Sequence, residues 1–158
     1  MLVGWSILLI MHGILAVFLV GAITHQAVSL WWPVRTSAAG FVDRFRAVRS
    51  ASYTNAIIAL YTLTAVIGGV LLYPTYRLTV RMLLIQLRLN AANGIFEFKE
   101  HLVAIGLGLL PAYWYYWREP LAPEQAGARR ALTALLALIV WWSFLVGHVV
   151  NDIMGFGA

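Results

Sequence analysis

Four long apolar segments, separated by short polar stretches, dominate the pattern of this chain. They run from about Val3 to Trp32, Tyr53 to Tyr73, Gly94 to Trp117 and Ala131 to Met154. Each has the roughly 20 residues that cross a hydrocarbon core of about 30 Å. Because lipid offers no partner to backbone polar groups, such segments form helices. The pattern therefore predicts an all-α protein, a four-transmembrane-helix bundle in which residues 1–158 form a single integral membrane domain.

The stretch between the second and third spans differs from the other two loops. It reads TYRLTVRMLLIQLRLNAA and is rich in helix formers. At 100° per residue, Arg77, Arg81 and Arg88 fall within about 40° of one another. We expect a short amphipathic helix in the membrane interface, with this basic stripe toward lipid phosphates. Lys99 and Glu100 follow as an ordinary charged cluster at the entry of the third span.

Composition agrees with a membrane protein and excludes several kinds of site. Of all residues, 62% are hydrophobic, 11% are charged and none is cysteine. The absence of cysteine excludes disulfides, cysteine-ligated iron–sulfur clusters and covalently attached haem. The net charge of +5 does not indicate nucleic-acid binding, because the basic residues lie at helix ends, where they contact membrane lipids. No Lys or Arg precedes the first apolar segment, so we expect a retained helix there.

Basic residues flank the predicted spans unevenly. The first and third loops hold seven arginines, namely Arg35, Arg44, Arg46, Arg49, Arg118, Arg129 and Arg130. The other side holds four basic residues, namely Arg77, Arg81, Arg88 and Lys99. Cytoplasmic loops carry the excess of Lys and Arg. We therefore expect the first and third loops in the cytoplasm and both termini on the outer side of the membrane.

Three of the four histidines fall at a similar predicted depth on three different spans. At about 1.5 Å per residue, His12 lies about 15 Å and His101 about 10 Å from the outer ends of their spans. His148 precedes the outer end of the fourth span by several residues. An ionisable side chain within a span is costly and by default marks a functional site, so we expect these three to share one. His25 lies about 20 Å deeper and is expected to be a hydrogen-bonding side chain.

A carboxylate accompanies two of these histidines at helical spacing. Glu97 precedes His101 by four residues, and Asp152 follows His148 by four. Residues four apart share a helix face. We expect each carboxylate to accept the free imidazole N–H and so to fix the tautomer of a ligating histidine.

Two kinds of cofactor fit these residues, and the sequence leaves both open. A b-type haem needs one or two axial histidines and arginines near its propionates; the candidates are His101 with His12 or His148, and Arg77 and Arg81. A compact copper, zinc or iron site would take nitrogen and oxygen ligands from His12, His101, His148, Glu97 and Asp152. The basic stripe on the same side favours haem b.

Two stretches carry a resemblance to known membrane proteins, LLYPTYRLTVR and FEFKEHLVAIGLGLLPAYWYYW. They look like segments of small bacterial four-helix membrane proteins, and the placement of histidines on successive spans resembles copper-resistance-D-like and b-type cytochrome-like proteins. The resemblance implies a redox-linked role with His101, inside the second stretch, as the best ligand. The second span has no histidine, and His12 and His25 do not share a face, so one haem is expected rather than two.

The sequence favours a haem-b-binding membrane subunit of a respiratory-chain or similar redox complex. Such a subunit would pass electrons between a periplasmic partner and quinone or another membrane redox subunit. The alternatives are a cofactor-free structural accessory subunit of a larger membrane complex and a copper- or metal-handling membrane protein. No nucleophile–base pair or phosphate loop indicates independent catalysis. We therefore expect an electron-transfer or accessory subunit rather than an independent enzyme.

Overall fold

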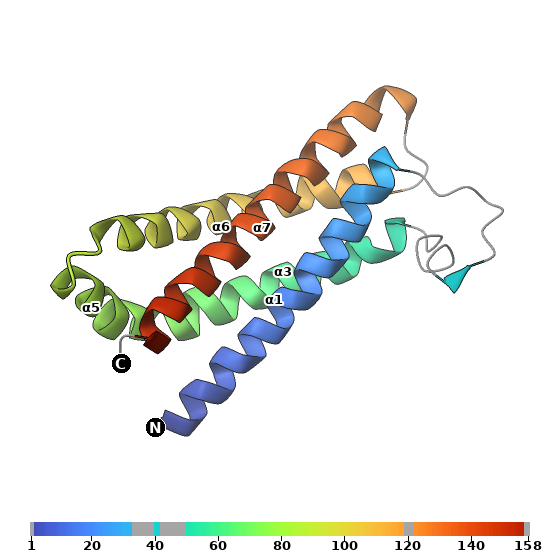
Figure 1. Ribbon diagram of the computed structural model, residues 1–158. Coiled ribbons are helices and arrows are strands. Elements are labelled where there is room, and N and C mark those ends of the chain that lie inside the picture. The colour runs from blue at the N-terminus through green and yellow to red at the C-terminus, as the bar shows by residue number, and fades with distance from the viewer. Residues whose placement is uncertain (1, 33–39, 42–49, 119–121, 157–158) are drawn as a thin grey trace.

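The computed structural model describes residues 2–32, 40–41, 50–118 and 122–156, and among these it is all-helical (Figure 1). The longest α-helices are α1 (Leu2–Trp31), α6 (Asn90–Trp117) and α7 (Ala126–Phe156). The remaining long helical stretch, second in chain order and called the second helical stretch below, contains α3 (Thr54–Val66) and extends on both sides of it. The predicted helical class is confirmed. The first-loop arginines, namely Arg35, Arg44, Arg46 and Arg49, lie outside the described residues.

The second helical stretch is longer than the second predicted span. It begins with the 3-10 turn η1 (Ser50–Tyr53) and, after α3, continues through η2 (Ile67–Leu72), α4 (Tyr73–Thr75), η3 (Tyr76–Val80) and α5 (Arg81–Gln86). Both η2 and η3 are π-helical. The arginine-bearing segment is therefore continuous with the second helix instead of forming a separate one. Figure 1 shows α5 bending away from the line of α3.

A Schellman turn ends α5 and brings the chain directly into α6. The N–H of Leu89 donates to the carbonyl of Leu84 (2.8 Å), and the N–H of Arg88 donates to that of Ile85 (3.0 Å). Arg88 has a φ of 57°, the left-handed conformation that such a turn requires. Because the turn is this short, α6 starts at Asn90, four residues before the predicted start of the third span.

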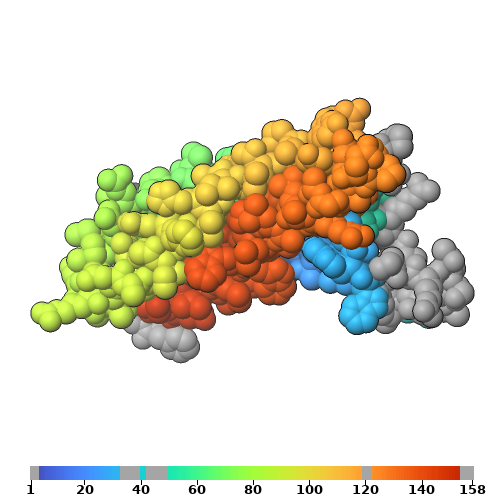
Figure 2. All heavy atoms as spheres, turned by 90° about the horizontal axis from the view of Figure 1, so that it is seen from above, coloured from blue at the N-terminus to red at the C-terminus, as the bar shows by residue number. Residues whose placement is uncertain are grey.

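The four long helical stretches pack as a closed ring. α6 packs on α7, α7 on α1, α1 on α3 and α3 on α6. Both termini and the α5–α6 turn lie at one end of the bundle, and the end of α6 and the start of α7 lie at the other (Figure 1). Seen from above, α6 and α7 lie side by side along the molecule (Figure 2).

Three stretches of the described chain are long and apolar enough to cross a membrane. They are Gly4–Trp31, Ser50–Gln86 and Pro123–Ile153. Their outer surfaces carry large apolar side chains; Phe18, for example, is 64% exposed and Leu138 is 66% exposed. Apolar surface of this extent is unfavourable in water. These features are compatible with a protein that crosses the membrane several times.

Two clusters of buried side chains hold the bundle together. The larger one joins all four long stretches, and its most deeply buried members include Ile23, Ile57, Tyr113, Leu136 and Ile139. The smaller one lies at the end with the termini and consists of Tyr76, Leu84, Val146 and Val150. The end of the second helical stretch is therefore packed against α7 as well as leading into α6.

Candidate functional site

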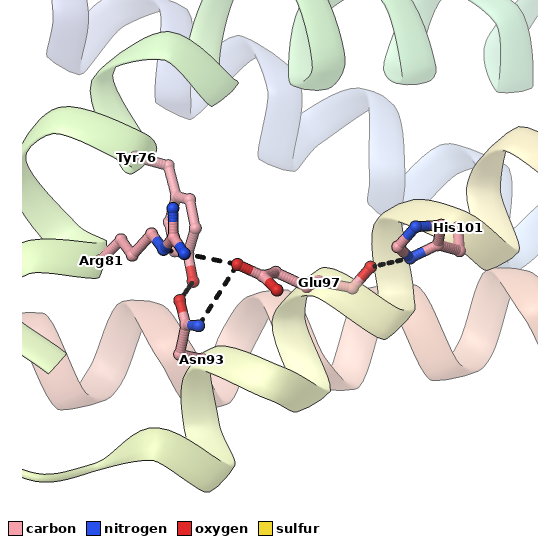
Figure 3. Close-up of polar contacts among 5 residues, drawn as sticks. All are labelled: Tyr76, Arg81, Asn93, Glu97 and His101. Atoms are coloured by element: carbon pink, nitrogen blue, oxygen red, sulfur yellow. Dashed lines mark hydrogen bonds and ion pairs between the residues drawn. The ribbon is translucent and has the colours of Figure 1, made fainter. Parts of the chain in front are cut away.

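His101 is held on α6 with one ring nitrogen committed to the backbone. Its Nδ1 lies 2.8 Å from the carbonyl oxygen of Glu97, one turn earlier (Figure 3). Because a carbonyl oxygen only accepts, Nδ1 is the donor, and the neutral ring then keeps its lone pair on Nε2. The side chain is exposed, so this nitrogen is open to a ligand from outside the bundle. A histidine fixed in this way is ready to bind a metal through Nε2.

The Glu97 carboxylate does not orient His101, contrary to expectation. Its Oε1 lies 3.4 Å from Arg81 Nε and accepts a hydrogen bond from Asn93 Nδ2 at 3.3 Å. Asn93 in turn accepts from the Tyr76 hydroxyl at 3.1 Å (Figure 3). A charged guanidinium is the stronger partner for a carboxylate than a neutral imidazole. The carboxylate therefore ties α6 to the end of the second helical stretch, and the backbone carbonyl of Glu97 takes its place at His101.

His148 and Asp152 are both exposed on α7. The His148 ring packs against Phe144, one turn earlier, with the ring centroids 5.2 Å apart and the planes inclined by 30°. An aromatic neighbour at this spacing orients the imidazole without using either ring nitrogen. Both nitrogens of His148 thus remain available for a ligand or a partner subunit.

His12 lies against the second helical stretch and is half-buried. A Cβ added to Gly68 of η2 would lie 2.9 Å from His12 Cε1, so a side chain at this position would require the imidazole to shift. The imidazole also lies against the backbone of Thr64. Its Nδ1 is buried and has no hydrogen-bond partner. The sequence predicted a functional His12 but not this close fit to Gly68.

The three candidate ligands do not meet at one point. His101 and His148 are exposed on α6 and α7, whereas His12 is half-buried between α1 and η2. Within the described part of the chain, no three His, Asp or Glu side chains are grouped so that they could hold a metal ion. Similar depth places the three side chains at the same level of the bundle, but it does not determine the direction in which each one points from its helix axis. Histidines at the same depth therefore need not converge. Ligation of a haem by one of them stays a prediction.

The predicted basic stripe is split by the local helix geometry. Arg77 is exposed, whereas Arg81 is half-buried and paired with Glu97. Each π-helical turn inserts a residue and rotates those after it by about 100°, so a uniform α-helical period does not apply across η3. Arg88, at a positive φ, follows the end of the helix. Of the three, Arg81 is the one whose side chain is committed to an ion pair, and Arg77 and Arg88 are both exposed.

Lys99 and Glu100, which were expected as a charged cluster at the entry of the third span, form an ion pair further along α6. Lys99 Nζ lies 2.7 Å from Glu100 Oε1, and the two side chains are only 12% and 26% exposed. The ammonium also lies 3.8 Å from the centre of the Phe96 ring. Both charges act electrostatically on His12. Because α6 begins at Asn90, the pair lies more than two turns inside the helix and is not at its entry. The sequence signal was the position of two adjacent charges within an apolar stretch.

The buried amide of Gln26, which the sequence did not single out, joins α1 to η1, α3 and α6 near the end of the bundle where α6 leads into α7. Gln26 of α1 is fully buried and donates from Nε2 to the Ser50 carbonyl (2.9 Å) and to Thr54 Oγ1 (3.1 Å). Its Oε1 accepts from the Tyr113 hydroxyl of α6. The neighbouring His25 is half-buried, with its ring centroid 4.7 Å from that of Tyr53. All the polar atoms of Gln26 are used within the bundle, which indicates a structural role.

No protein-family model, no curated protein and no solved structure matches the chain significantly.

Proposed function

We propose that this chain is a four-span subunit in a bacterial inner membrane and that it takes part in electron transfer through a b-type haem. The fourth span would be α6, which runs beside α7. Its 28 residues extend about 42 Å at 1.5 Å per residue, more than a hydrocarbon core requires. Its charged residues are paired, as Arg81 with Glu97 and Lys99 with Glu100, and pairing lowers the cost of charges at membrane depth.

The observation that carries the haem proposal is the orientation of His101. Its Nδ1 donates to a backbone carbonyl, so Nε2 is free and exposed. His101 would hold the haem iron through this nitrogen, and the bound haem would supply the one-electron chemistry. Arg77, which is exposed at the same end, remains the candidate for contact with a propionate.

The exposure of His101 also indicates how the haem would be held. With the axial nitrogen open to the outside of the bundle, the haem would lie between this chain and a second membrane subunit or copy. The second axial ligand would then come from that partner or from His148, which is also exposed. Electrons would pass to a membrane or periplasmic redox partner or to quinone.

A spectrum of the protein, purified in mild detergent with its native partners, tests the proposal. We expect a Soret band with α and β bands after reduction, and we expect His101→Ala to abolish or strongly alter them. His25→Ala is the matched control, because His25 packs on Tyr53 at the other end of α1, and it should keep the wild-type spectrum. Retention of an unchanged haem spectrum in His101→Ala would overturn the assignment of this ligand.

A cofactor-free accessory subunit is the second candidate, and the many exposed large apolar side chains of the described helices support it. The exposed apolar side chains of α1 and α7 would then serve contact with lipid and other subunits. A folded, colourless preparation without bound metal would support this function. Metal analysis of the same sample tests the copper- or metal-handling alternative, for which copper or zinc bound in proportion to protein is expected.

A further inference from the structure

A group of polar side chains from three elements meets inside the bundle, away from His101. His12 of α1 lies against Thr64 at the end of α3 and against Gly68 of η2. The Lys99–Glu100 ion pair of α6 acts on the same imidazole. The two segments that pack around the imidazole, α1 and residues 54–72, contain no Asp, Glu, Lys or Arg.

Two buried polar atoms in this group have no partner in the described structure. They are His12 Nδ1 and Thr64 Oγ1. Buried polar atoms are hydrogen-bonded in nearly all native proteins, to protein or to ordered water. A small hydrogen-bonding molecule within reach of both atoms would satisfy them.

The group lies well below the end of the bundle. His12 follows the start of α1 by ten residues and Lys99 follows the start of α6 by nine, so both lie roughly 15 Å along their helices. Both helices start at the end that holds the termini and the α5–α6 turn (Figure 1). An ion pair at this depth usually faces a water-filled space or another polar group and is seldom directed at lipid.

Polar contacts lead from that end of the bundle toward the group. Tyr76, Asn93, Glu97 and Arg81 form a connected set beside the α5–α6 turn (Figure 3). Glu100 lies three residues beyond Glu97, less than one turn further along α6. Polar side chains are therefore present from the α5–α6 turn to within one helical turn of Glu100.

We propose that His12, Thr64, Lys99 and Glu100 form a hydrated site within the membrane, reached from the end with the α5–α6 turn, in which water is bound between His12 and Thr64. The hydration stabilises the ion pair in the bundle, and the bound water satisfies the two unpartnered atoms. Gly68 is required because any side chain there displaces the imidazole from the site. This inference goes beyond the proposed function and does not depend on the presence of a haem.

Cysteine accessibility in membrane vesicles tests the hydrated site, since the natural chain contains no cysteine. In Thr64→Cys the sulfur replaces the unpartnered hydroxyl. We expect it to react with a charged, membrane-impermeant methanethiosulfonate reagent at least about tenfold faster than Leu63→Cys, because a charged reagent reaches hydrated positions and not lipid. Leu63 is the matched control at nearly the same depth, since its side chain is 51% exposed on the apolar surface. The reaction should be fast only when the reagent is added on the side of the α5–α6 turn.

Two further variants keep the test decisive. Ile57→Cys, in the packed core of the same helix, should not react. Adding Lys99→Met and Glu100→Gln together to Thr64→Cys removes both charges without leaving one unpaired, and it should slow the labelling toward the Leu63→Cys rate. Equal labelling of Thr64→Cys and Leu63→Cys in protein that elutes as the wild type would overturn the proposal. The proposal would also be overturned if Thr64→Cys reacted fast and its labelling rate did not change when Lys99→Met and Glu100→Gln were added.

Discussion

Gln26 is the polar side chain whose hydrogen bonds within the bundle are most complete. It is fully buried, and its amide uses both donor and acceptor atoms on residues of other elements. An intramolecular hydrogen bond typically contributes about 0.5–1.5 kcal/mol, whereas a buried polar group without a partner costs more. The arrangement therefore stabilises one relative position of α1, α3 and α6 and disfavours others.

The ring of Tyr61 on α3 approaches the backbone of α6 closely at Gly106. The Tyr61 hydroxyl donates to the carbonyl of Val103 at 3.1 Å. To reach it, the ring crosses Gly106, where a Cβ would collide with the tyrosine hydroxyl and Cζ. Gly106 is buried, so the ring has no free space into which it can move. Glycine at 106 thus permits the contact between α3 and α6.

The first prediction follows from this contact. Gly106→Ala should destabilise the protein by about 1–3 kcal/mol, because the added methyl group overpacks a filled site. The loss is to be measured by thermal or denaturant unfolding in detergent. Gly108→Ala is the matched control on the same helix; a Cβ there meets no atom within 4 Å, and replacing a helical glycine by alanine adds about 1 kcal/mol of stability. An equal change in unfolding free energy for both variants would show that the Tyr61 ring does not approach Gly106 this closely.

At the scale of elements, the stretch from Ser50 to Gln86 is unusual because it changes helix type five times. Two π-helical segments, η2 and η3, interrupt it, and Pro74 lies between them. Proline has no N–H for an intrahelical bond, and a π turn accommodates an extra residue at such a point. The change in direction carries α5 toward the start of α6, where Arg81 meets Glu97. The helix type thus decides which arginine faces the bundle.

The end of α5 supports a second prediction. Arg88 adopts a φ of 57° in the Schellman turn, a conformation that costs residues with a Cβ roughly 1 kcal/mol. Arg88→Gly should therefore raise the free energy of unfolding by about 1 kcal/mol, as glycine is the usual residue at this position. Arg88→Ala removes the same charge but keeps the Cβ, and it should give no such gain. If the free energy of unfolding rises equally in both variants, the removed charge and not the backbone conformation is the cause.

At the scale of the whole molecule, the ring of four helical stretches has two chemically different ends. One end holds both termini and the α5–α6 turn, and the other joins α1 to η1 and α6 to α7 (Figure 1). The second end carries Arg118, Arg129 and Arg130; the guanidinium of Arg118 lies 4.8 Å from the centre of the Trp114 ring, and that of Arg129 4.8 Å from Trp117. Aromatic and basic side chains together are typical of a membrane interface.

This asymmetry gives the third prediction, which concerns orientation. Reporter fusions at Ala39 and Ala158, both outside the described residues, should give opposite signals, with Ala39 cytoplasmic and Ala158 periplasmic. Replacing the first-loop arginines by glutamine should weaken this orientation, whereas replacing Glu124 by glutamine should not, because acidic residues contribute little to it. A cytoplasmic signal at Ala158 would reverse the orientation and would place the hydrated site in the inner half of the membrane.

The sequence by itself determined the helical class, because runs of about 20 apolar residues leave the backbone no alternative in lipid. It also singled out His12, His101 and Arg81 as polar groups within apolar surroundings, and each makes a defined contact in the structure. The number of spans, the cofactor and the membrane orientation remain predictions from that same pattern. Hydropathy reports the length and depth of a helix, and these quantities are local to the chain.

Only the tertiary structure decided which side chains meet, because this depends on the rotation and local type of each helix. It separated His101 and His148 from His12, turned the Glu97 carboxylate toward Arg81, and placed Lys99 and Glu100 inside the bundle. It also joined the predicted interfacial segment to the second helix through two π-helical turns. A uniform period of 100° per residue cannot anticipate such turns, and a shift of one residue moves a side chain by about a quarter of the helix circumference.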